Sequence, residues 1–377
     1  MGARKQGLQG SEEGSRIPGL SGTGGSRMPP SMQDARAIAL VDSPTFGAHI
    51  PPGYHPERPE RLLAARRAIA TLSTAGATFD TVEARPATLD ELGRVHTPAY
   101  LESLLGLRGK QGYLDGDTFY SPRSVEAAVL AAGASIALVE RLLRGGERDS
   151  KLGVGLLRPP GHHAKADAAM GFCLVNNVAV AAAHARASGI SRVAVVDFDV
   201  HHGNGTQAIF AADPSVLYVS THQFPFYPGT GALDEVGTGA GKGFTVNVPL
   251  EAGQGDAAYR GAFERIVLPV LAEYKPELVL VSAGFDAALR DPLAGMELTA
   301  PAYGFMMAEL TKVAEAHAGG KIALLLEGGY DLPSLEAGLG HAIQGMTGRS
   351  FDVRRDVDAP DLARAQRALQ ASWTNLR

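Results

Sequence analysis

Short runs of apolar residues alternate with longer amphipathic stretches along most of the chain. The runs are nearly continuous in Val, Leu, Ile and Ala, which is typical of strands buried on both faces. They occupy residues 37–41, 152–157, 193–196, 216–219, 278–281 and 322–326. The stretches between them have helical spacing and occupy residues 60–75, 125–143, 177–188, 257–274 and 301–318. This alternation predicts a parallel sheet with helices on both faces.

Polar residues that are unusual next to buried strands follow directly after most of these runs. In a parallel sheet the carboxyl ends of the strands meet at one edge, and functional sites form there. Chance would scatter such residues over both edges. The pattern therefore predicts one functional site, built from residues 158–163, 197–204, 220–222, 283–286 and 327–331.

The first residues differ in character from the rest of the chain. Residues 1–35 are rich in Gly, Ser and charged residues and lack apolar periodicity. Such a segment cannot offset its ordering entropy by burial, so we predict a disordered leader. Residues 36–377 show no internal repeat and no second change in composition, which predicts a single domain.

Composition narrows the class of protein. A net charge of only −5 predicts no extended basic face and hence no nucleic-acid partner. The single cysteine, Cys173, can form neither an internal disulfide nor a thiolate metal site. No apolar stretch has the length of a transmembrane helix, and the N-terminus lacks the apolar core of a secretory signal. We therefore predict a cytoplasmic protein without a membrane partner, and the oligomeric state stays open.

Asp199 and His201 stand two residues apart at a strand end, where both side chains point the same way. Asp286, at the end of another strand, supplies a third ligand, and three ligands with an open position are typical of a catalytic metal site. Two oxygens and one nitrogen suit Zn²⁺, and Fe²⁺ or Co²⁺ is also compatible. Each residue alone could instead cap a helix. Residues 197–202, however, place several titratable groups directly after a buried strand, which is costly without a cation. Gly203 has no side chain to hold a second ion, so we predict one metal.

The adjacent histidines His162 and His163 follow a Pro-Pro-Gly turn at another strand end. Hydrolysis of an amide needs a base to deprotonate the attacking water and an acid to protonate the leaving amine. Two neighbouring imidazoles can divide these roles if their surroundings separate their pKa values. Asp197 and Asn204 are candidate partners, since a charged Asp favours imidazolium and a neutral Asn does not. The alternative is an inert pair on a surface loop.

Tyr330 completes the candidate chemistry. It follows Gly328 and Gly329, which allow a tight turn and a close approach of the backbone to a ligand. The Tyr330 hydroxyl could then donate to an oxyanion opposite the metal. Gly-Gly-Tyr is a weak motif by itself, and a buried structural tyrosine is the alternative. Its position at a strand end favours the functional interpretation.

With these residues assembled, the chain resembles the histone deacetylase superfamily, in particular class II-like bacterial histone deacetylase-like amidohydrolases. Asn204 and the Arg-Pro-Pro-Gly form of the histidine motif are similar to the class II branch. The resemblance covers residues 37–348. Its motifs lie at residues 158–164, 171–173, 176–177, 197–205, 227–231, 284–286 and 327–330.

The resemblance implies the arginase/deacetylase fold, an open eight-stranded parallel sheet with helices on both faces. It implies one catalytic zinc ion at Asp199, His201 and Asp286. Acid–base catalysis would fall to His162 and His163, with Asp197 and Asn204 beside them, while Tyr330 would polarise the substrate carbonyl. The implied substrate channel comprises Gly171, Phe172, Tyr227, Leu293, Gly328 and, at the rim, Asp117. A structural potassium ion would be held, mostly by backbone carbonyls, at Asp197, Asp199, His201, Ser220 and Thr221.

The function expected from this resemblance is zinc-dependent removal of acetyl or other acyl groups from the lysine side chain of a protein or peptide. An acetylpolyamine amidohydrolase is the alternative, and Leu293 tilts the choice toward lysine because polyamine-selective relatives place a Glu there. A non-catalytic acyl-lysine binding module is a third hypothesis, against which the intact Tyr330 argues. The segment 55–61, His-Pro-Glu-Arg-Pro-Glu-Arg, is expected near the rim of the site.

Overall fold

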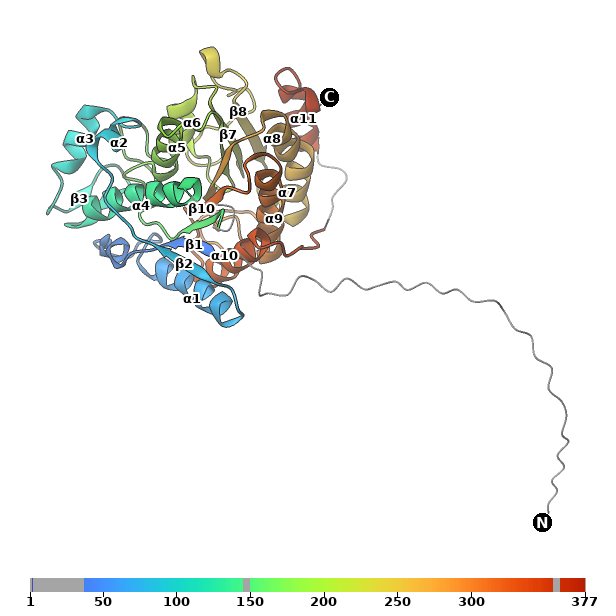
Figure 1. Ribbon diagram of the computed structural model, residues 1–377, viewed down its shortest axis with the longest axis horizontal. Coiled ribbons are helices and arrows are strands. Elements are labelled where there is room, and N and C mark those ends of the chain that lie inside the picture. The colour runs from blue at the N-terminus through green and yellow to red at the C-terminus, as the bar shows by residue number, and fades with distance from the viewer. Residues whose placement is uncertain (1, 3–36, 145–149, 355–359, 377) are drawn as a thin grey trace. The chain divides into compact units, whose positions relative to one another are not determined.

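The computed structural model describes Gly2 and residues 37–144, 150–354 and 360–376. The described residues from position 37 onward belong to one compact unit, Ala35–Arg377 (Figure 1). The predicted leader, residues 1–35, lies outside the described residues except for Gly2. Within the described part of the chain, no helix is both long enough and apolar enough to cross a membrane.

An eight-stranded sheet, with every neighbouring pair parallel, forms the centre of this unit. Its spatial order is β2-β1-β5-β10-β9-β6-β7-β8. The predicted open parallel sheet is therefore confirmed. The strands are β1 (Ile38–Val41), β2 (Phe79–Val82), β5 (Leu152–Gly155), β6 (Val193–Asp197), β7 (Val216–Gln223), β8 (Thr245–Leu250), β9 (Leu278–Ala283) and β10 (Ile322–Leu326). A separate antiparallel pair consists of β3 (Gly112–Tyr113) and β4 (Phe119–Tyr120).

Helices cover the sheet in two layers (Figure 1). One layer contains α1 (Glu60–Thr74), α10 (Leu332–Met346), α9 (Ala300–His317) and α8 (Leu268–Tyr274), which pack side by side in that order. The other contains α4 (Ser124–Arg144), α5 (Asn177–Ala187) and α6 (Asn204–Phe210). The remaining helices are α2 (Leu89–Gly93), α3 (Pro98–Leu105), α7 (Asp256–Ala262) and α11 (Pro360–Leu369). Short 3-10 turns occupy Pro44–Ala48, Gly239–Gly241 and Thr374–Leu376.

The structure differs from the sequence-based expectation at several elements. The helix expected at residues 257–274 is interrupted by a π-helical turn, Phe263–Val267, between α7 and α8. Pro269 explains this, because a proline inside a helix lacks the N–H for the regular hydrogen bond and crowds the carbonyl four residues earlier. Strand β7 continues to Gln223, so residues 220–222 lie within the strand rather than after it. Strands β2 and β8 were not predicted from the pattern, since neither is a continuous apolar run.

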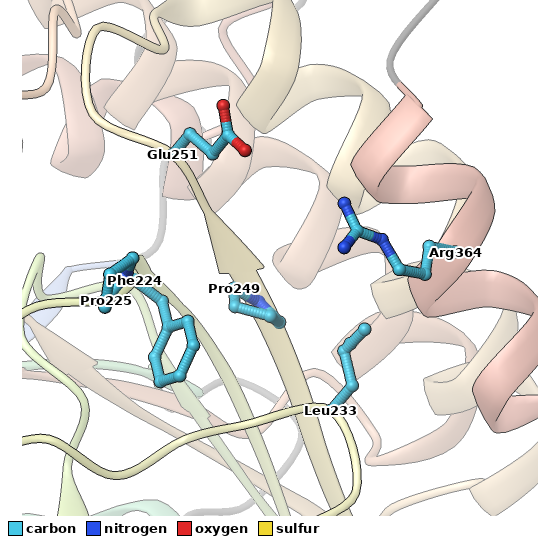
Figure 2. Close-up of a pocket in the computed structure, with 6 residues that line it drawn as sticks. All are labelled: Phe224, Pro225, Leu233, Pro249, Glu251 and Arg364. Carbon is cyan, nitrogen blue, oxygen red and sulfur yellow. The ribbon is translucent and has the colours of Figure 1, made fainter.

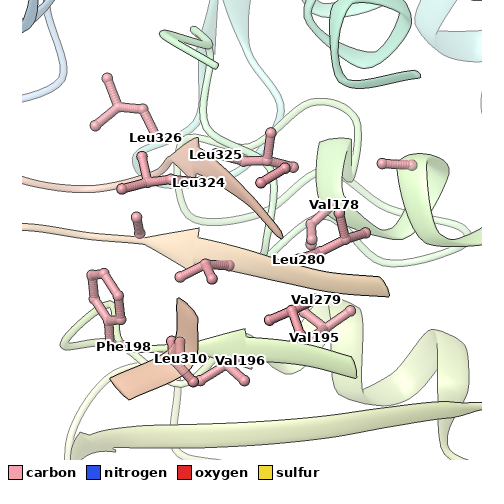
Figure 3. Close-up of a cluster of buried hydrophobic side chains, with 14 of the residues drawn as sticks. Val178, Val195, Val196, Phe198, Val279, Leu280, Leu310, Leu324, Leu325 and Leu326 are labelled. Carbon is pink, nitrogen blue, oxygen red and sulfur yellow. The ribbon is translucent and has the colours of Figure 1, made fainter. Parts of the chain in front are cut away.

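The core lies between the central strands and the two helical layers. Figure 3 shows side chains of β6, β9 and β10 in one cluster with Val178 of α5 and Leu310 of α9. Both helical residues are fully buried. Removing a Val or Leu side chain from water stabilises the fold by roughly 1.5–3 kcal/mol before entropy costs. The strand sequences therefore need apolar residues at consecutive positions, because both faces of the sheet are covered.

Candidate active site

The predicted site residues come from the carboxyl ends of the four central strands. Strands β5, β10, β9 and β6 are neighbours in the sheet, although their order along the chain is different. Their ends carry the histidine pair, Tyr330, Asp286 and the Asp199–His201 pair respectively. Parallel strands end at the same edge, so these groups meet there.

Asp199, His201 and Asp286 form one buried cluster. One candidate ligand atom from each of them lies within 4.8 Å of the other two. The His201 Nδ1 atom is 3.1 Å from Asp199 Oδ1 and 3.2 Å from Asp286 Oδ2. Asp286 Oδ2 is buried and has no well-directed hydrogen-bond partner among the described residues. Two carboxylates and an imidazole with an unsatisfied buried oxygen are a donor set that fits a divalent cation.

Backbone groups pack closely around these carboxylates. The Gly328 N–H donates to Asp199 Oδ2 at 2.8 Å, and the Val200 N–H donates to Asp286 Oδ1 at 3.0 Å. A Cβ atom on Gly328 would lie 2.0 Å from Asp286 Oδ2, and one on Gly284 would lie 2.1 Å from Asp199 Oδ2. Only glycine fits at these two positions while the carboxylates keep their places.

The two buried carboxylates of the cluster repel each other when no cation lies between them. Burial raises the pKa of Asp286, and the neighbouring charge of Asp199 raises it further. Burial also acts to raise the pKa of Asp199, but His162 and His201 outweigh it and hold that pKa below its usual range. A bound cation would offset the repulsion between the two carboxylates.

The two histidines have different partners. His162 Nδ1 lies 3.1 Å from Asp197 Oδ2, and His163 Nδ1 lies 2.8 Å from Asn204 Oδ1. Their ring centroids are 4.0 Å apart. The Tyr218 hydroxyl also donates to Asp197 Oδ2, at 3.1 Å, and helps to hold that carboxylate.

The surroundings separate the pKa values of the two imidazoles. Burial lowers the pKa of His162, but Asp199 and Asp197 outweigh it and raise the pKa to about 10. Burial lowers the pKa of His163 well below its usual value, and the charges of His162 and His201 lower it further. One imidazole is thus suited to holding a proton and the other to accepting one.

Tyr330 is buried and lies close enough to Asp286 and Asp199 for their charges to raise the pKa of its hydroxyl. The edge of its ring meets that of Phe172, with centroids 5.9 Å apart and planes at 86°. The Arg61 guanidinium lies over the ring, 5.0 Å from its centroid. Burial raises the pKa of Tyr330 well above its usual value, while Arg61 opposes the shift. The phenol therefore stays protonated and can donate a hydrogen bond.

Residues predicted to line a channel lie around the same cluster. Gly171 has φ +55°, and a Cβ on it would lie 2.4 Å from His163 Cδ2. The Tyr227 ring is half-exposed and meets the His163 ring edge-on at 5.3 Å. Asp117 lies near Phe172, because the hydroxyl of the neighbouring Thr118 accepts the Phe172 N–H at 3.1 Å. The channel itself stays a prediction.

Leu293 is half-buried in the loop that follows β9, and its N–H donates to Asp291 Oδ1 at 3.0 Å. Its contact with a substrate stays a prediction.

The predicted potassium positions lie on the two neighbouring strands β6 and β7. Asp197 pairs with Ser220 in the sheet register. The Ser220 hydroxyl makes a hydrogen bond of 2.9 Å with His222 Nδ1, and the buried Thr221 Oγ1 has no hydrogen-bond partner in the described chain. Potassium binding itself stays a prediction.

Sequence reasoning missed a buried charged network beneath the site. Glu327 is fully buried, and its Oε2 accepts the N–H groups of Gly161, at 2.6 Å, and His162, at 3.2 Å. Arg61 Nε donates to the Gly329 carbonyl at 2.7 Å, and another nitrogen of the same guanidinium donates to the Glu327 carbonyl. Arg61 therefore holds the backbone directly before Tyr330.

Glu57 links this network to the segment after β5 that carries the histidines. It forms ion pairs with Arg61 at 3.2 Å and with Arg158 at 2.6 Å, and all three side chains are fully buried. The high density of charged residues at 55–61 is the one sequence feature that could have indicated this network. The segment was expected at the rim; His55 contacts Phe172 there, but Glu57 and Arg61 lie inside.

A separate surface pocket of about 290 Å³ lies beside the loop that follows β7. Figure 2 shows Glu251, which follows β8, and Arg364 of α11 on different sides of it. None of the predicted site residues lines this pocket. Its lining comprises Phe224, Pro225, Leu233, Pro249, Glu251 and Arg364.

Comparisons with known proteins agree on one family. The family model of the histone deacetylase domain matches residues 55–346. Over 283 residues the chain is 44% identical to the histone deacetylase-like amidohydrolase of Pseudomonas aeruginosa, covering 73% of this chain and 72% of that protein. It is 42% identical over 331 residues to human polyamine deacetylase HDAC10, covering 84% of this chain and 47% of that protein. The crystal structure of the HDA15 HD domain is similar with a TM-score of 0.83 and 38% identity, covering 90% of this chain and 97% of that one.

Proposed function

The chain belongs to the histone deacetylase family, and from that premise we propose that it is a zinc-dependent amidohydrolase that removes acetyl or other acyl groups from the lysine side chain. One observation carries the proposal: the buried Asp199–His201–Asp286 cluster and the histidine pair with separated pKa values lie at the same sheet edge. We also propose that residues 36–377 are a single catalytic domain. A cytoplasmic location stays a prediction.

Asp199, His201 and Asp286 would hold the metal through two oxygens and one nitrogen. When bound, a zinc ion supplies a Lewis acid that polarises the acyl carbonyl and increases the acidity of a water molecule. Iron(II) is also compatible with this ligand set. The potassium ion proposed at Asp197 and Ser220 would be structural.

His163 is the proposed base. Because its Nδ1 faces the Asn204 oxygen, the ring carries a proton there and its Nε2 is free to accept one from the attacking water. His162, whose charged form is favoured by Asp197, is the proposed acid that protonates the leaving amine at Nε2. The Tyr330 hydroxyl donates to the oxygen of the acyl group as negative charge develops on it.

The substrate would reach these groups between Phe172 and Tyr227, with Gly171 and Gly328 leaving room for a linear acyl-amine stem. Asp117 and Leu293 would form the rim. Leu293 supports lysine over polyamine substrates, because it offers no charge to a second ammonium group.

An acetylpolyamine substrate is the second candidate, favoured by the similarity to polyamine deacetylase HDAC10. The two are separated by comparing kcat/KM for an acetyl-lysine peptide and N-acetylputrescine, each with and without a chelator. Higher kcat/KM on the peptide supports the proposal, and the reverse supports the polyamine reading. Tight binding of acyl-lysine by the metal-loaded protein without turnover would indicate a binding module instead.

The decisive variant is Asp286→Ala. It should lose bound metal and lower hydrolysis of a fluorogenic acetyl-lysine peptide by at least about a thousandfold, because one of three ligands is removed. Metal content and rate are measured on the same preparation. Asp256→Ala is the matched control, since Asp256 is an aspartate outside the candidate site whose carboxylate accepts hydrogen bonds from Thr299. Full activity of Asp286→Ala would contradict the proposal.

A further inference from the structure

Tyr330 needs an external anchor because of the backbone in front of it. Gly328 and Gly329 precede it, and Gly329 adopts φ +118°, a conformation that other residues rarely accept. Two successive glycines leave a chain with more conformational freedom than any other pair. Arg61 restrains the carbonyl side of this turn through Glu327 and Gly329. The N–H side of the turn needs a different partner.

Asp291 is that partner. Its Oδ2 atom accepts the N–H of Tyr330 at 2.6 Å and the N–H of Asp331 at 3.1 Å. These successive N–H groups stand at the start of α10, where the positive end of the helix dipole favours a carboxylate. The Asp291 side chain is largely buried, with 7% of its surface exposed. Without it, both N–H groups would lose their protein partner.

The second carboxylate oxygen of Asp291 binds the loop that carries Leu293, at the proposed substrate rim. Its Oδ1 accepts the Leu293 N–H at 3.0 Å, and its own N–H donates to the Ala288 carbonyl at 2.9 Å. The same loop is fixed further along by Gly295, whose N–H donates to Gln223 Oε1 at 2.9 Å. The carboxylate thus joins two loops that are about 40 residues apart in sequence.

We propose that Asp291 is a positioning residue: its carboxylate fixes the backbone of Tyr330 to the loop that carries Leu293, so that the phenol is held at the reacting carbonyl. The proposal rests on the proposed function of Tyr330. A residue that acts only through Tyr330 should change kcat more than KM, because the phenol interacts most strongly with the developing oxyanion.

Asp291→Ala removes the hydrogen bonds to Tyr330 and to Leu293 together. We expect kcat to fall by about 10–100-fold with KM within about threefold, since loss of one positioned donor has effects of this order or larger. Metal content should be unchanged. Asp291→Asn should recover part of the loss, because its single oxygen can still accept the Tyr330 N–H while its NH₂ cannot accept from Leu293. Asp213→Ala is the matched control: Asp213 likewise accepts a backbone N–H, from Ser215, in a turn outside the candidate site.

A double-mutant cycle with Tyr330→Phe separates positioning from a general structural role. If Asp291 acts through the Tyr330 hydroxyl, Asp291→Ala should add no further loss of kcat in the Tyr330→Phe background. An equal loss in both backgrounds would overturn the proposal.

Hydrogen exchange gives a readout that does not depend on activity. Asp291→Ala should speed exchange of the amides of residues 330 and 331 by about tenfold or more, leaving β10 unchanged. Unchanged protection would overturn the proposal even if the wild-type protein hydrolysed none of the substrates. Inactivity of the wild type would contradict the proposed function alone. The exchange result would then show whether the Asp291 carboxylate fixes the backbone of Tyr330.

Discussion

At the scale of single residues, the cluster of Asp199, His201 and Asp286 depends on two glycines that are not themselves candidate ligands. Gly284 and Gly328 matter because their missing Cβ atoms leave the space that the carboxylates occupy. Sequence reasoning recognised Gly328 as a place where the backbone turns tightly, but the group it approaches is Asp286, from a different strand. A local pattern cannot show such a contact.

Gly328→Ala should therefore lower metal content by at least about tenfold. The new methyl group would overlap the Asp286 carboxylate, so either this carboxylate or the backbone must move. The metal-to-protein ratio after purification measures this, and circular dichroism verifies the fold. Gly93→Ala is the control, since a Cβ there has nothing within 4 Å. A fully metal-loaded, active Gly328→Ala protein would show that the cluster is not the metal site.

At the scale of elements, α4 shows how packing can reverse an ordinary propensity. Alanine normally stabilises a helix interior by up to about 1 kcal/mol relative to glycine. A Cβ on Gly133 of α4, however, would lie 1.9 Å from the Arg85 carbonyl oxygen. The segment at Arg85 crosses the helix closely, and the Ala87 N–H donates to the Val129 carbonyl at 3.0 Å.

Gly133→Ala should lower the free energy of unfolding by roughly 2–3 kcal/mol, because the added methyl group overpacks this crossing. Gly340→Ala in α10 is the matched variant, since a Cβ there meets open space. It should raise the free energy of unfolding by up to about 1 kcal/mol. Urea denaturation of both variants measures the difference, and equal effects would refute the packing argument.

Elements were predicted well where a local property decides them. Strand β10 has the predicted bounds, because its five residues are all buried and all apolar. Strand β8 escaped prediction because its sequence, Thr-Val-Asn-Val-Pro-Leu, contains polar residues and a proline. Its place at the edge of the sheet accounts for the proline, which cannot donate to a neighbouring strand. The polar Asn247 is buried, and its side chain donates to Gln207 Oε1 and to the Glu235 carbonyl.

At the scale of the whole molecule, stability should depend on neutral histidines in the interior. Burial lowers the pKa of His49 to about 3, of His96 to about 4 and of His222 to about 3. Each is hydrogen-bonded in its neutral form, for example His49 Nδ1 to Ser124 Oγ at 2.6 Å. Their ordinary pKa in the unfolded chain is 6.5, so the unfolded state binds more protons below that pH.

These histidines should therefore lower the free energy of unfolding as the pH drops below 6.5. Glu327 and Asp291 act in the opposite direction, because burial raises their pKa values to about 7 and the folded state takes up their protons first. Each of the three histidines contributes a loss of roughly 1.6 kcal/mol between pH 6.5 and pH 5. The stabilisation is complete above 6.5 and continues to be lost until the pH reaches the folded pKa. Urea unfolding between pH 7 and 4.5 at constant salt measures the slope, and His96→Gln should reduce it. An unchanged slope in the His96→Gln variant would contradict a buried neutral His96.

The sequence by itself determined the fold class and which polar residues gather at one edge of the sheet. Strands covered on both faces must be apolar at consecutive residues, and parallel strands must present their following residues at one edge, so both features leave a local signal. Asp199, His201, Asp286, the histidine pair and Tyr330 could all be found in this way.

Only the tertiary structure decided which strands are neighbours and how the polar groups pair. Gly328 and Asp199 are 129 positions apart, and their hydrogen bond exists because β10, β9 and β6 adjoin in the sheet. The contacts of Arg61, Glu327 and Asp291 are of the same kind. Such pairings depend on the path of the chain through space, and residues that meet over a long distance carry no periodicity that would reveal their partners.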